Sequence, residues 1–353
     1  MKTEPIGSIP RPPALIQAMV AFQAGTITRE ALDQEQSTAL DDTLKRFAET
    51  GSPIISDGEQ TKPSFATYPL SGLDNLAPNG VVIPFADGHT RQLPRLTRGP
   101  FRYAVHAVEF TRTARARTKL PLKQAVISAS ALSLLYPAAG IEGYARQDFL
   151  ADLINAAEAD IRGAFDAGAV VVQMDFTEAR LSLKLDPSGG LLRNFVELNN
   201  QVLGRFSADE RQKIGVHVCP GGDHDSTHSA DVDYAKLLPD LFQMQAGRFY
   251  LQMASERDRP SVLRVVKEAA KPEQFIFVGV IDPITTVVES PEQVRERVLE
   301  AAKILPVELL VTTDDCGFAP FADDTSTARD TAFEKIKVRV EGTKLAAKVL
   351  EVG

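Results

Sequence analysis

Repeated alternation of short apolar segments with helical patterns is the feature that most limits how this chain can fold. Eight strand-like segments can be marked along its 353 residues, and most are separated by stretches with helical periodicity. These segments are 4–9, 53–57, 122–128, 169–175, 214–219, 249–254, 275–281 and 309–314. Eightfold strand–helix alternation favours an α/β fold of the (β/α)8 TIM-barrel type over an open sheet. We expect residues 1–353 to form a single barrel domain.

The segments between the strands carry recognisable helix signals. Residues 149–167 place apolar side chains at helical spacing. Ser290 followed by Pro291 is typical of a helix start, with serine as the N-cap and proline in the first turn. A last helix is expected over about residues 327–350.

Two stretches fall outside the alternation. Residues 72–105 contain two extended runs around Asp87-Gly88, which predicts a β-hairpin inserted after the second strand. Residues 182–208 form a long connection after the fourth strand, interrupted at 186–190. Both insertions follow strands, so they lie on the rim where barrel enzymes place their active sites.

Composition excludes several classes of protein. The net charge is −8 and there is no run of lysine or arginine, which argues against a nucleic-acid partner. Two cysteines cannot form a disulfide framework. No apolar run reaches membrane-spanning length, and no apolar signal core follows the N-terminus. We expect a cytoplasmic protein without a membrane partner, and the oligomeric state stays open, a homo-oligomer included.

The segment 213–222 carries the strongest chemical signal. It predicts a short strand that ends at a Pro-Gly-Gly stop. Residues two apart on a strand share one face, so His217 and Cys219 point into the same space. The second cysteine, Cys316, follows another strand. One nitrogen and two sulfurs at strand ends are suitable ligands for Zn²⁺, although lone cysteines are usually only small apolar residues.

Polar residues also follow the other strands. They include Ser8, Asp57 and Glu59, Asp175, Gln252 and Glu256, Asp282, and Asp314 with Asp315. The carboxyl ends of barrel strands face one mouth, where catalytic residues gather. An acidic residue after a strand is often only a helix cap, but the whole set together favours an active site.

These motifs resemble the cobalamin-independent methionine synthase family, in its single-barrel, catalytic-half form. The resemblance is carried by the motifs at 6–11, 57–60, 173–175, 217–219 and 315–317, which span nearly the whole chain in the family's order. It implies a (β/α)8 barrel whose zinc ion binds a thiol substrate. Carried over, it implies zinc ligands at His217, Cys219 and Cys316. Ser8, Glu59 and Asp175 would hold the amino-acid part of a homocysteine-like substrate, with Glu59 or Asp175 on its ammonium group.

The chain departs from the family at the sixth strand, where the family supplies a glutamate as a further zinc ligand. Strict alignment puts Gln252 there, whereas a small slip would use Glu256. We expect Glu256, because a carboxylate is the more common zinc ligand.

A second departure concerns the proton donor. Full-length family members carry a histidine after the seventh strand, and this chain has Asp282 there. Asp282, His224 or His228 could serve instead. The full-length enzymes also have an N-terminal barrel that helps to hold the folate, and this chain has no counterpart of it.

The resemblance implies an enzyme that transfers a methyl group from a methylated folate or corrinoid to homocysteine. The alternative within the superfamily is alkylation of another thiol, such as epoxide opening by coenzyme M. Two further hypotheses are a non-catalytic barrel and a metal-free porphyrinogen decarboxylase, for which Arg11 and Arg180 are the candidate arginines at the mouth.

Overall fold

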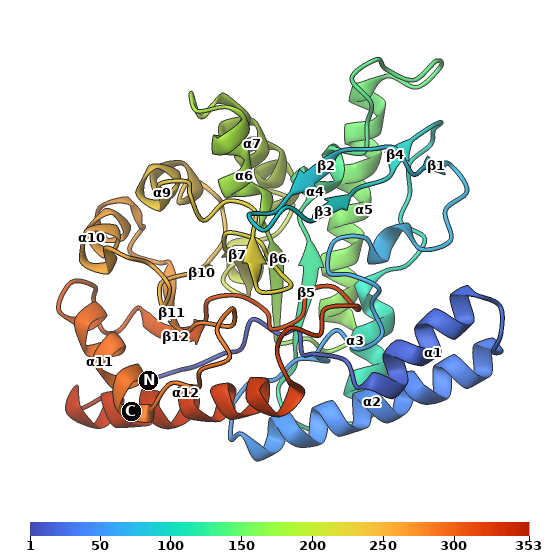
Figure 1. Cartoon of the computed structure of the whole chain (residues 1–353). Coiled ribbons are helices and arrows are strands. Elements are labelled where there is room, and N and C mark those ends of the chain that lie inside the picture. Colours follow the sequence, from blue (N-terminus) through green and yellow to red (C-terminus); the bar gives the residue numbers. More distant parts are fainter. Residues whose placement is uncertain (353) are drawn as a thin grey trace.

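The computed structural model describes residues 1–352, and its centre is a parallel sheet that curves into a barrel (Figure 1). Six strands form ladders in the order β12-β11-β10-β7-β6-β5. Their bounds are β5 (Lys123–Ile127), β6 (Val171–Asp175), β7 (Ile214–Val218), β10 (Arg248–Leu251), β11 (Phe275–Ile281) and β12 (Leu310–Asp314). Each of the six overlaps a strand predicted from the sequence.

The first two predicted strands close the barrel through single parallel bridges instead of ladders. Thr3, the residue before the first predicted strand, bridges Thr312 on β12, and Ile55 bridges Leu122, the residue before β5. The two segments meet where the Ser56 hydroxyl donates to the Gly7 carbonyl at 2.7 Å. Each segment contains proline, which has no N–H to donate to a ladder. The predicted barrel is therefore confirmed. Its first two strands are irregular extended segments and not regular ladders.

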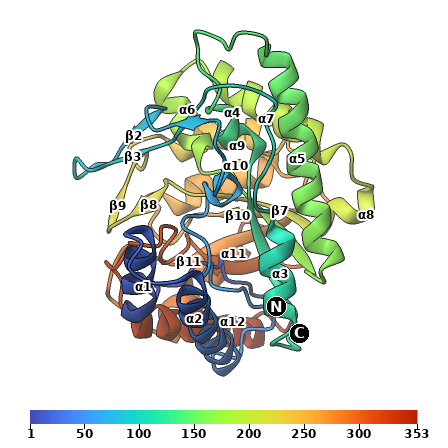
Figure 2. The ribbon, with the colours of Figure 1, turned by 90° about the vertical axis from the view of Figure 1, so that its right-hand side faces the viewer.

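Helices surround the sheet on its outer side (Figures 1 and 2). They are α1 (Pro13–Gln23), α2 (Arg29–Glu49), α3 (Ala107–Arg115), α4 (Ala129–Ser133), α5 (Arg146–Asp166), α6 (Glu178–Leu185), α7 (Gly190–Leu203), α8 (Ala208–Arg211), α9 (Tyr234–Leu241), α10 (Arg259–Ala269), α11 (Pro291–Ala302), α12 (Arg329–Val349) and the short 3-10 helix η1 (Tyr68–Leu70). The predicted start of α11 is confirmed, because Ser290 and Gln293 form a capping box around Pro291. Within residues 1–352, no helix combines the length and apolar character needed to cross a membrane.

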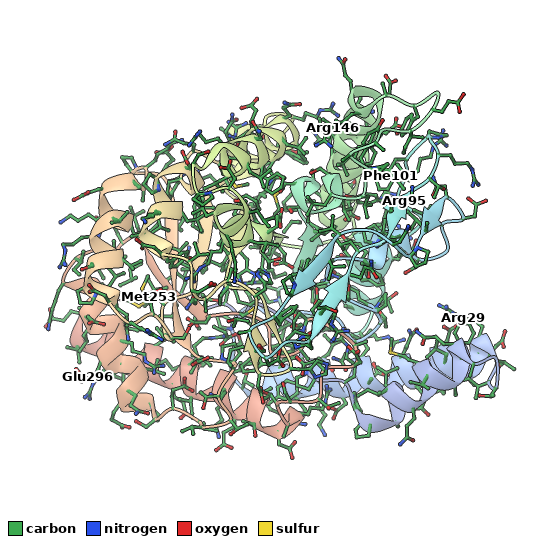
Figure 3. All side chains as sticks on the ribbon, turned by 45° about the horizontal axis from the view of Figure 1, so that its top comes forward. Arg29, Arg95, Phe101, Arg146, Met253 and Glu296 are labelled. Carbon is green, nitrogen blue, oxygen red and sulfur yellow. The ribbon has the colours of Figure 1, made fainter. Side chains whose placement is uncertain are left out.

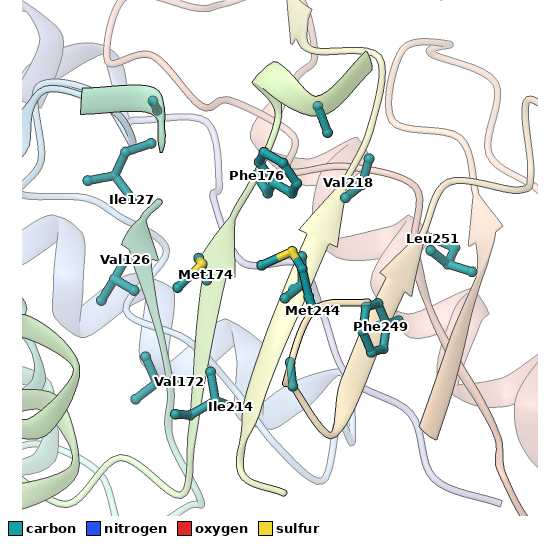
Figure 4. Close-up of a cluster of buried hydrophobic side chains, with 14 of the residues drawn as sticks. Val126, Ile127, Val172, Met174, Phe176, Ile214, Val218, Met244, Phe249 and Leu251 are labelled. Atoms are coloured by element: carbon teal, nitrogen blue, oxygen red, sulfur yellow. The ribbon is translucent and has the colours of Figure 1, made fainter. Parts of the chain in front are cut away.

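Strand alternation separates an apolar outer face from a mixed inner face, which is polar on β6 and β7 and carries the apolar cluster of Tyr250, Phe277 and Val311 on β10, β11 and β12. Val172, Met174 and Val218 belong to the large core cluster beneath the helices, and Figure 4 shows this layer. The residues between them, such as Gln173 and His217, point to the opposite face of the sheet, inside the barrel. Lys123, Gln173, Asp175 and His217 therefore gather in the barrel interior.

The predicted insertion is confirmed as a pair of short antiparallel sheets. β2 (Val82–Pro84) pairs with β3 (Thr90–Gln92), and β1 (Leu76–Ala77) pairs with β4 (Arg95–Leu96). Arg95 and Phe101 mark this segment in Figure 3. A third small hairpin follows β7 and joins β8 (Gly222–Asp223) to β9 (Ser226–Thr227).

The connection 182–208 is mostly helical. It contains the end of α6, all of α7 and the first residue of α8. The break expected at 186–190 lies between α6 and α7, where Gly189 adopts a left-handed φ of 75°.

Candidate functional site

The inner face of the barrel brings together His217, Cys219 and Cys316. His217 is on β7, Cys219 directly follows that strand, and Cys316 lies two residues beyond β12. Their ligand atoms all lie within 4.8 Å of one another, and the three side chains are buried. The two sulfur atoms are 3.1 Å apart, and both cysteines are free. Zinc binds cysteine sulfur and histidine nitrogen at about 2.0–2.3 Å, so this donor set fits one zinc ion.

Asp175 orients the imidazole of His217. Its Oδ1 lies 3.0 Å from His217 Nδ1, and both side chains are buried. Burial alone would lower the pKa of His217, but the Asp175 carboxylate and the Cys316 sulfur raise it to about 10. A carboxylate on the second ring nitrogen is the usual support of a metal-binding histidine. Asp175 therefore holds the imidazole of one member of this candidate metal site.

A buried chain of hydrogen bonds continues from Asp175 through the barrel interior. Gln173 Nε2 donates to Asp175 Oδ1 at 2.8 Å, and Lys123 Nζ donates to Gln173 Oε1 at 2.8 Å. Lys123 also lies over the ring of Tyr250, 4.2 Å from its centroid, and 3.9 Å from Glu4. Burial lowers the pKa of Lys123 to about 7, despite the nearby Glu4 carboxylate. This series of hydrogen bonds holds Asp175 at a fixed position beside His217.

Asp315 joins the end of β12 to the loop after β10. Its carboxylate accepts the backbone N–H groups of Met253, Ala254 and Ser255 at 2.8, 2.7 and 2.8 Å. A side chain at Gly279 would place its Cβ 1.9 Å from Asp315 Oδ1, so only glycine fits beside this carboxylate. Burial raises the pKa of Asp315 to about 6. Because Cys316 is the next residue, these bonds fix the backbone that carries the third member of the candidate metal site.

We call His217, Cys219 and Cys316 the metal-ligand group. A cavity of about 490 Å³ opens beside it. This volume is within the range of small-molecule sites. Its polar lining includes Ser8, Glu59, Gln173, Asp175, Glu178, His217, Cys219, His228 and Cys316, and much of the rest is apolar. Ile83, Phe85 and Leu93 bring the inserted segment onto the same cavity. The insertion therefore forms part of the site.

Arg91 fastens the inserted hairpin to two other loops of the rim. Its guanidinium pairs with Asp223 after β7 and with Asp323 after β12. It also lies over the ring of Phe321, 4.1 Å from the centroid. These contacts hold the inserted hairpin over the carboxyl ends of the strands, where it lines the cavity.

Ser8 and Glu59, which the resemblance assigns to the substrate, line the cavity. The Ser8 hydroxyl accepts the backbone N–H of Ala319 at 3.3 Å. Glu59 is buried and forms an ion pair with the buried Lys62 at 2.9 Å. Burial lowers the pKa of Lys62, but Glu59 and Asp57 outweigh it and raise the pKa, so Lys62 is an ammonium. Glu59 therefore has an internal cation as its partner.

Among the histidines, cysteines and acids of residues 1–352, Glu256 does not join the metal-ligand group, and Gln252 has other partners. Gln252 is buried, accepts a hydrogen bond from Arg180 and donates to the Ser255 hydroxyl at 2.7 Å. Glu256 is half-buried, and its carboxylate accepts the backbone N–H of Arg257 at 3.1 Å. The metal-ligand group thus has three members, and the structure does not bring Glu256 to them.

Asp282 and His224 lie outside the cavity lining, whereas His228 is part of it. The half-buried Asp282 accepts the N–H of Ile284 at 3.0 Å, and burial raises its pKa. His224 is in the turn of the β8–β9 hairpin, 3.2 Å from Arg91. Burial, with the charges of Lys184 and Arg180, lowers the pKa of His228 to about 4, so this imidazole is neutral at neutral pH.

Arg11 and Arg180, the candidate decarboxylase residues, already have internal partners. Arg11 is buried and donates to backbone carbonyls, including that of Glu59 at 2.6 Å. Arg180 donates to Gln252 and to the carbonyl of Val232 at 2.7 Å. Neither lines the cavity formed by the described residues.

Sequence reasoning missed Lys62, Lys123 and Glu178. Lys123 begins an otherwise mostly apolar strand, which is a signal for a buried, partnered charge. Glu178 resembles an ordinary acidic residue in the first turn of a helix, so its burial has no local signature.

Comparison with known proteins finds one family over almost the whole chain. Residues 1–341 match the family described as cobalamin-independent synthase, catalytic domain. A methionine synthase of Saccharolobus solfataricus is 22% identical, over 99% of this chain and 96% of that protein. One from Sulfolobus acidocaldarius is 23% identical, over 99% of this chain and 94% of that protein.

Solved structures share the fold. A B12-independent methionine synthase from Shewanella sp. W3-18-1, in complex with selenomethionine, superposes with a TM-score of 0.75 at 18% identity, covering 99% of this chain and 98% of that one. A putative vitamin-B12 independent methionine synthase from Listeria monocytogenes gives 0.73 at 23% identity, covering 98% of both chains.

Proposed function

This chain belongs to the family of cobalamin-independent synthase catalytic domains, and from that premise we propose that it transfers a methyl group to the thiol of homocysteine with the help of zinc. The observation that carries the proposal is the group of His217, Cys219 and Cys316 at the wall of a ligand-sized cavity. The methionine synthases among its relatives support the choice of homocysteine as the thiol.

The residues of the chain have distinct tasks in this reaction. His217, Cys219 and Cys316 would hold the zinc ion, which supplies a positive charge that keeps a thiol deprotonated at neutral pH. Asp175 holds the imidazole of His217 in place, and Asp315 holds the backbone before Cys316. The net reaction exchanges the S–H bond for an S–CH₃ bond, and the leaving group of the methyl donor takes the proton. The cavity walls keep the two reactants in line.

We assign the amino-acid part of homocysteine to Ser8, Glu59 and Asp175. All three line the cavity that contains the metal-ligand group. Glu59 and Asp175 already contact Lys62 and His217, so an ammonium group would share these carboxylates with internal partners. Asp282 and His224 lie outside the lining, so we propose no direct proton transfer from either residue to the leaving group.

A second candidate is alkylation of a thiol that has no amino group, such as coenzyme M in epoxide opening. The observation that favours it is the buried Lys62–Glu59 pair at 2.9 Å. This pair already compensates the carboxylate that a substrate ammonium would otherwise neutralise.

Metal analysis tests the zinc site. Wild-type protein should hold about one zinc ion per chain, and Cys219→Ser and Cys316→Ser should lose most of it. Ser229→Ala, a buried change after the β8–β9 hairpin and outside the metal-ligand group, is the matched control. Full zinc occupancy in both cysteine variants would refute the site. Glu256→Gln and Gln252→Ala in the same assay test for a fourth ligand.

A binding comparison separates the two candidate substrates. Homocysteine and coenzyme M are titrated into the zinc-loaded protein without an alkyl donor. Tighter binding of homocysteine, weakened by Glu59→Gln at unchanged zinc content, supports methionine synthesis. Equal binding of coenzyme M would favour the second candidate.

A further inference from the structure

His228 is a buried imidazole in the cavity wall, and one of its ring nitrogens lacks a hydrogen-bond partner within residues 1–352. The residue directly follows β9, is 6% exposed and lines the cavity. Its Nδ1 lies 2.8 Å from the hydroxyl oxygen of Ser229, whereas Nε2 makes no hydrogen bond to the described part of the chain. Nε2 is therefore the nitrogen that a ligand in the cavity can use.

The contacts of Ser229 determine which nitrogen of His228 carries the proton. Ser229 Oγ lies 3.1 Å from the carbonyl oxygen of Pro220, which can only accept, so the single hydroxyl hydrogen is donated there. The hydroxyl then meets His228 Nδ1 as an acceptor, and Nδ1 must supply the N–H. Burial and the charges of Lys184 and Arg180 lower the pKa of His228 to about 4, so the ring takes up no second proton at neutral pH. Nε2 is thus an unprotonated acceptor.

The Nε2 edge of His228 lies beside the metal-ligand group. A Cβ at Gly221 would be 1.8 Å from Nε2, so the missing side chain of this glycine leaves the space that the ring occupies. The N–H of Gly221 donates to Cys219 Sγ at 3.4 Å, and Gly221 itself lines the cavity. On another side, Phe85 of the inserted segment packs edge-on against the ring, with centroids 5.5 Å apart. The imidazole is therefore fixed in position close to Cys219.

The charges near His228 select the kind of group that Nε2 can accept. The Lys184 ammonium donates to the backbone carbonyl of His228 at 3.1 Å, and the charges of Lys184 and Arg180 both act against a positive charge on the ring. They act in the same way against a cationic ligand group placed at Nε2. An anionic group without hydrogen brings nothing for the lone pair to accept. The group that fits is an uncharged O–H or N–H.

We propose that Nε2 of His228 accepts a hydrogen bond from an uncharged O–H or N–H group of the alkyl donor and thereby selects which donors bind. The inference rests on the proposed function, because Ser8, Glu59 and Asp175 are assigned there to homocysteine, which leaves His228 to the second reactant. A buried acceptor without a partner is costly, and such a ligand group supplies the missing bond. His228 gives up no proton in this role, since Nε2 carries none. It is a specificity residue, in contrast to the proton donor considered from the sequence.

Three small probes test the requirement for an uncharged donor. Phenol carries one O–H group and is neutral at pH 7, toluene has the same shape without a donor, and benzylammonium carries its donors on a cation. Each is titrated by calorimetry at pH 7 into the purified full chain of known zinc content. The proteins are wild type, His228→Phe, His228→Gln and His106→Phe, the last a matched change at a half-buried histidine outside the cavity lining.

Phenol should bind wild type and His106→Phe alike and bind His228→Phe about fivefold more weakly, the loss expected for one neutral hydrogen bond. His228→Gln, whose amide oxygen can accept, should recover part of this loss. Toluene and benzylammonium should be insensitive to His228→Phe. No phenol binding to wild type, or equal phenol affinity in wild type and His228→Phe, would overturn the proposal, and an equal loss for benzylammonium would overturn the preference for an uncharged group.

A site-specific signal separates a lost contact from an altered fold. In protein labelled with ¹⁵N-histidine, the unprotonated Nε2 of His228, identified by its absence in His228→Gln, should move upfield when phenol is added and stay in place with toluene. An unchanged signal while phenol demonstrably binds would also overturn the proposal. Since neither thiol nor methyl transfer takes part, this failure is distinguishable from failure of the zinc chemistry.

Discussion

Replacing Asp175 by asparagine should weaken zinc binding without removing any zinc ligand. Oδ1 of Asp175 contacts both His217 Nδ1 at 3.0 Å and Gln173 Nε2 at 2.8 Å. An asparagine oxygen at the same place keeps both contacts and removes only the negative charge. Asp175→Ala removes the contacts as well.

The expected magnitude follows from the role of Asp175 behind a metal ligand. Loss of such a partner typically lowers metal affinity about 10–100-fold, or roughly 1.4–2.8 kcal/mol. We expect Asp175→Asn near the lower end of this range, because the hydrogen bond remains, and Asp175→Ala near the upper end. Glu59→Gln, which changes a cavity acid paired with Lys62, should leave zinc affinity unchanged.

The assay is competition for zinc between the protein and a chromophoric chelator at fixed pH. Circular dichroism and thermal unfolding establish that each variant is folded. Zinc affinity in Asp175→Ala equal to that of wild type would refute the orienting role. An equal loss in Glu59→Gln would show that cavity charge in general, and not the contact with His217, controls the affinity.

Three further predictions concern stability. The pKa of Lys123 is lowered to about 7 by burial, so the folded protein binds fewer protons than the unfolded chain between about pH 7 and 10. The free energy of unfolding should rise with pH in this window, by up to about 1.4 kcal/mol per pH unit, and Lys123→Met should flatten the rise; an identical slope in the variant would contradict the lowered pKa. For Glu178 the sign is opposite, because burial raises its pKa to about 7. Stability should be lost between about pH 4.5 and 7, and Glu178→Gln should exceed wild type by roughly 2–3 kcal/mol at pH 8 but not at pH 4.5 in denaturant titrations. Gly221 has a φ of 71°, and a Cβ there would lie 1.8 Å from His228 Nε2. Gly221→Ala should therefore cost about 1–3 kcal/mol in thermal unfolding, whereas Gly25→Ala, with a φ of 69° but open space, should cost less.

The barrel could be predicted because its information is local and repeated. Each strand is a short apolar run, and the helices carry ordinary signals such as the Ser290 capping box. The irregularity of the first two strands was not predicted. Their prolines and glycines leave only single bridges, at Thr3 and Ile55. Such backbone is held by its neighbours rather than by its own propensity.

The metal-ligand group could be predicted because strand alternation alone puts His217 and Cys219 on one face. The surroundings of the sixth strand could not, because they depend on a contact between distant segments. Asp315 binds the backbone of 253–255, and this determines how the chain leaves β10 before Glu256. Asp315 is 60 residues from Ser255 in the sequence. No local pattern near Glu256 reveals this contact.

The pairing of Glu59 with Lys62 was also beyond sequence reasoning. A lysine three residues after an acid is common at surfaces, where such pairs contribute little. Here both side chains are almost fully buried, with exposed fractions of 0% for Lys62 and 4% for Glu59. Only the barrel, which places Lys62 against the Ala125 carbonyl at 2.9 Å, shows that the ammonium is internal.

X-ray absorption at the zinc edge, measured on the wild-type protein with and without homocysteine, tests the central claim most directly. We predict a protein shell with nitrogen from His217 and sulfur from Cys219 and Cys316. Adding homocysteine should contribute one further sulfur neighbour at about 2.3 Å. An unchanged zinc spectrum, under conditions in which homocysteine demonstrably binds, would contradict zinc-assisted transfer to this thiol.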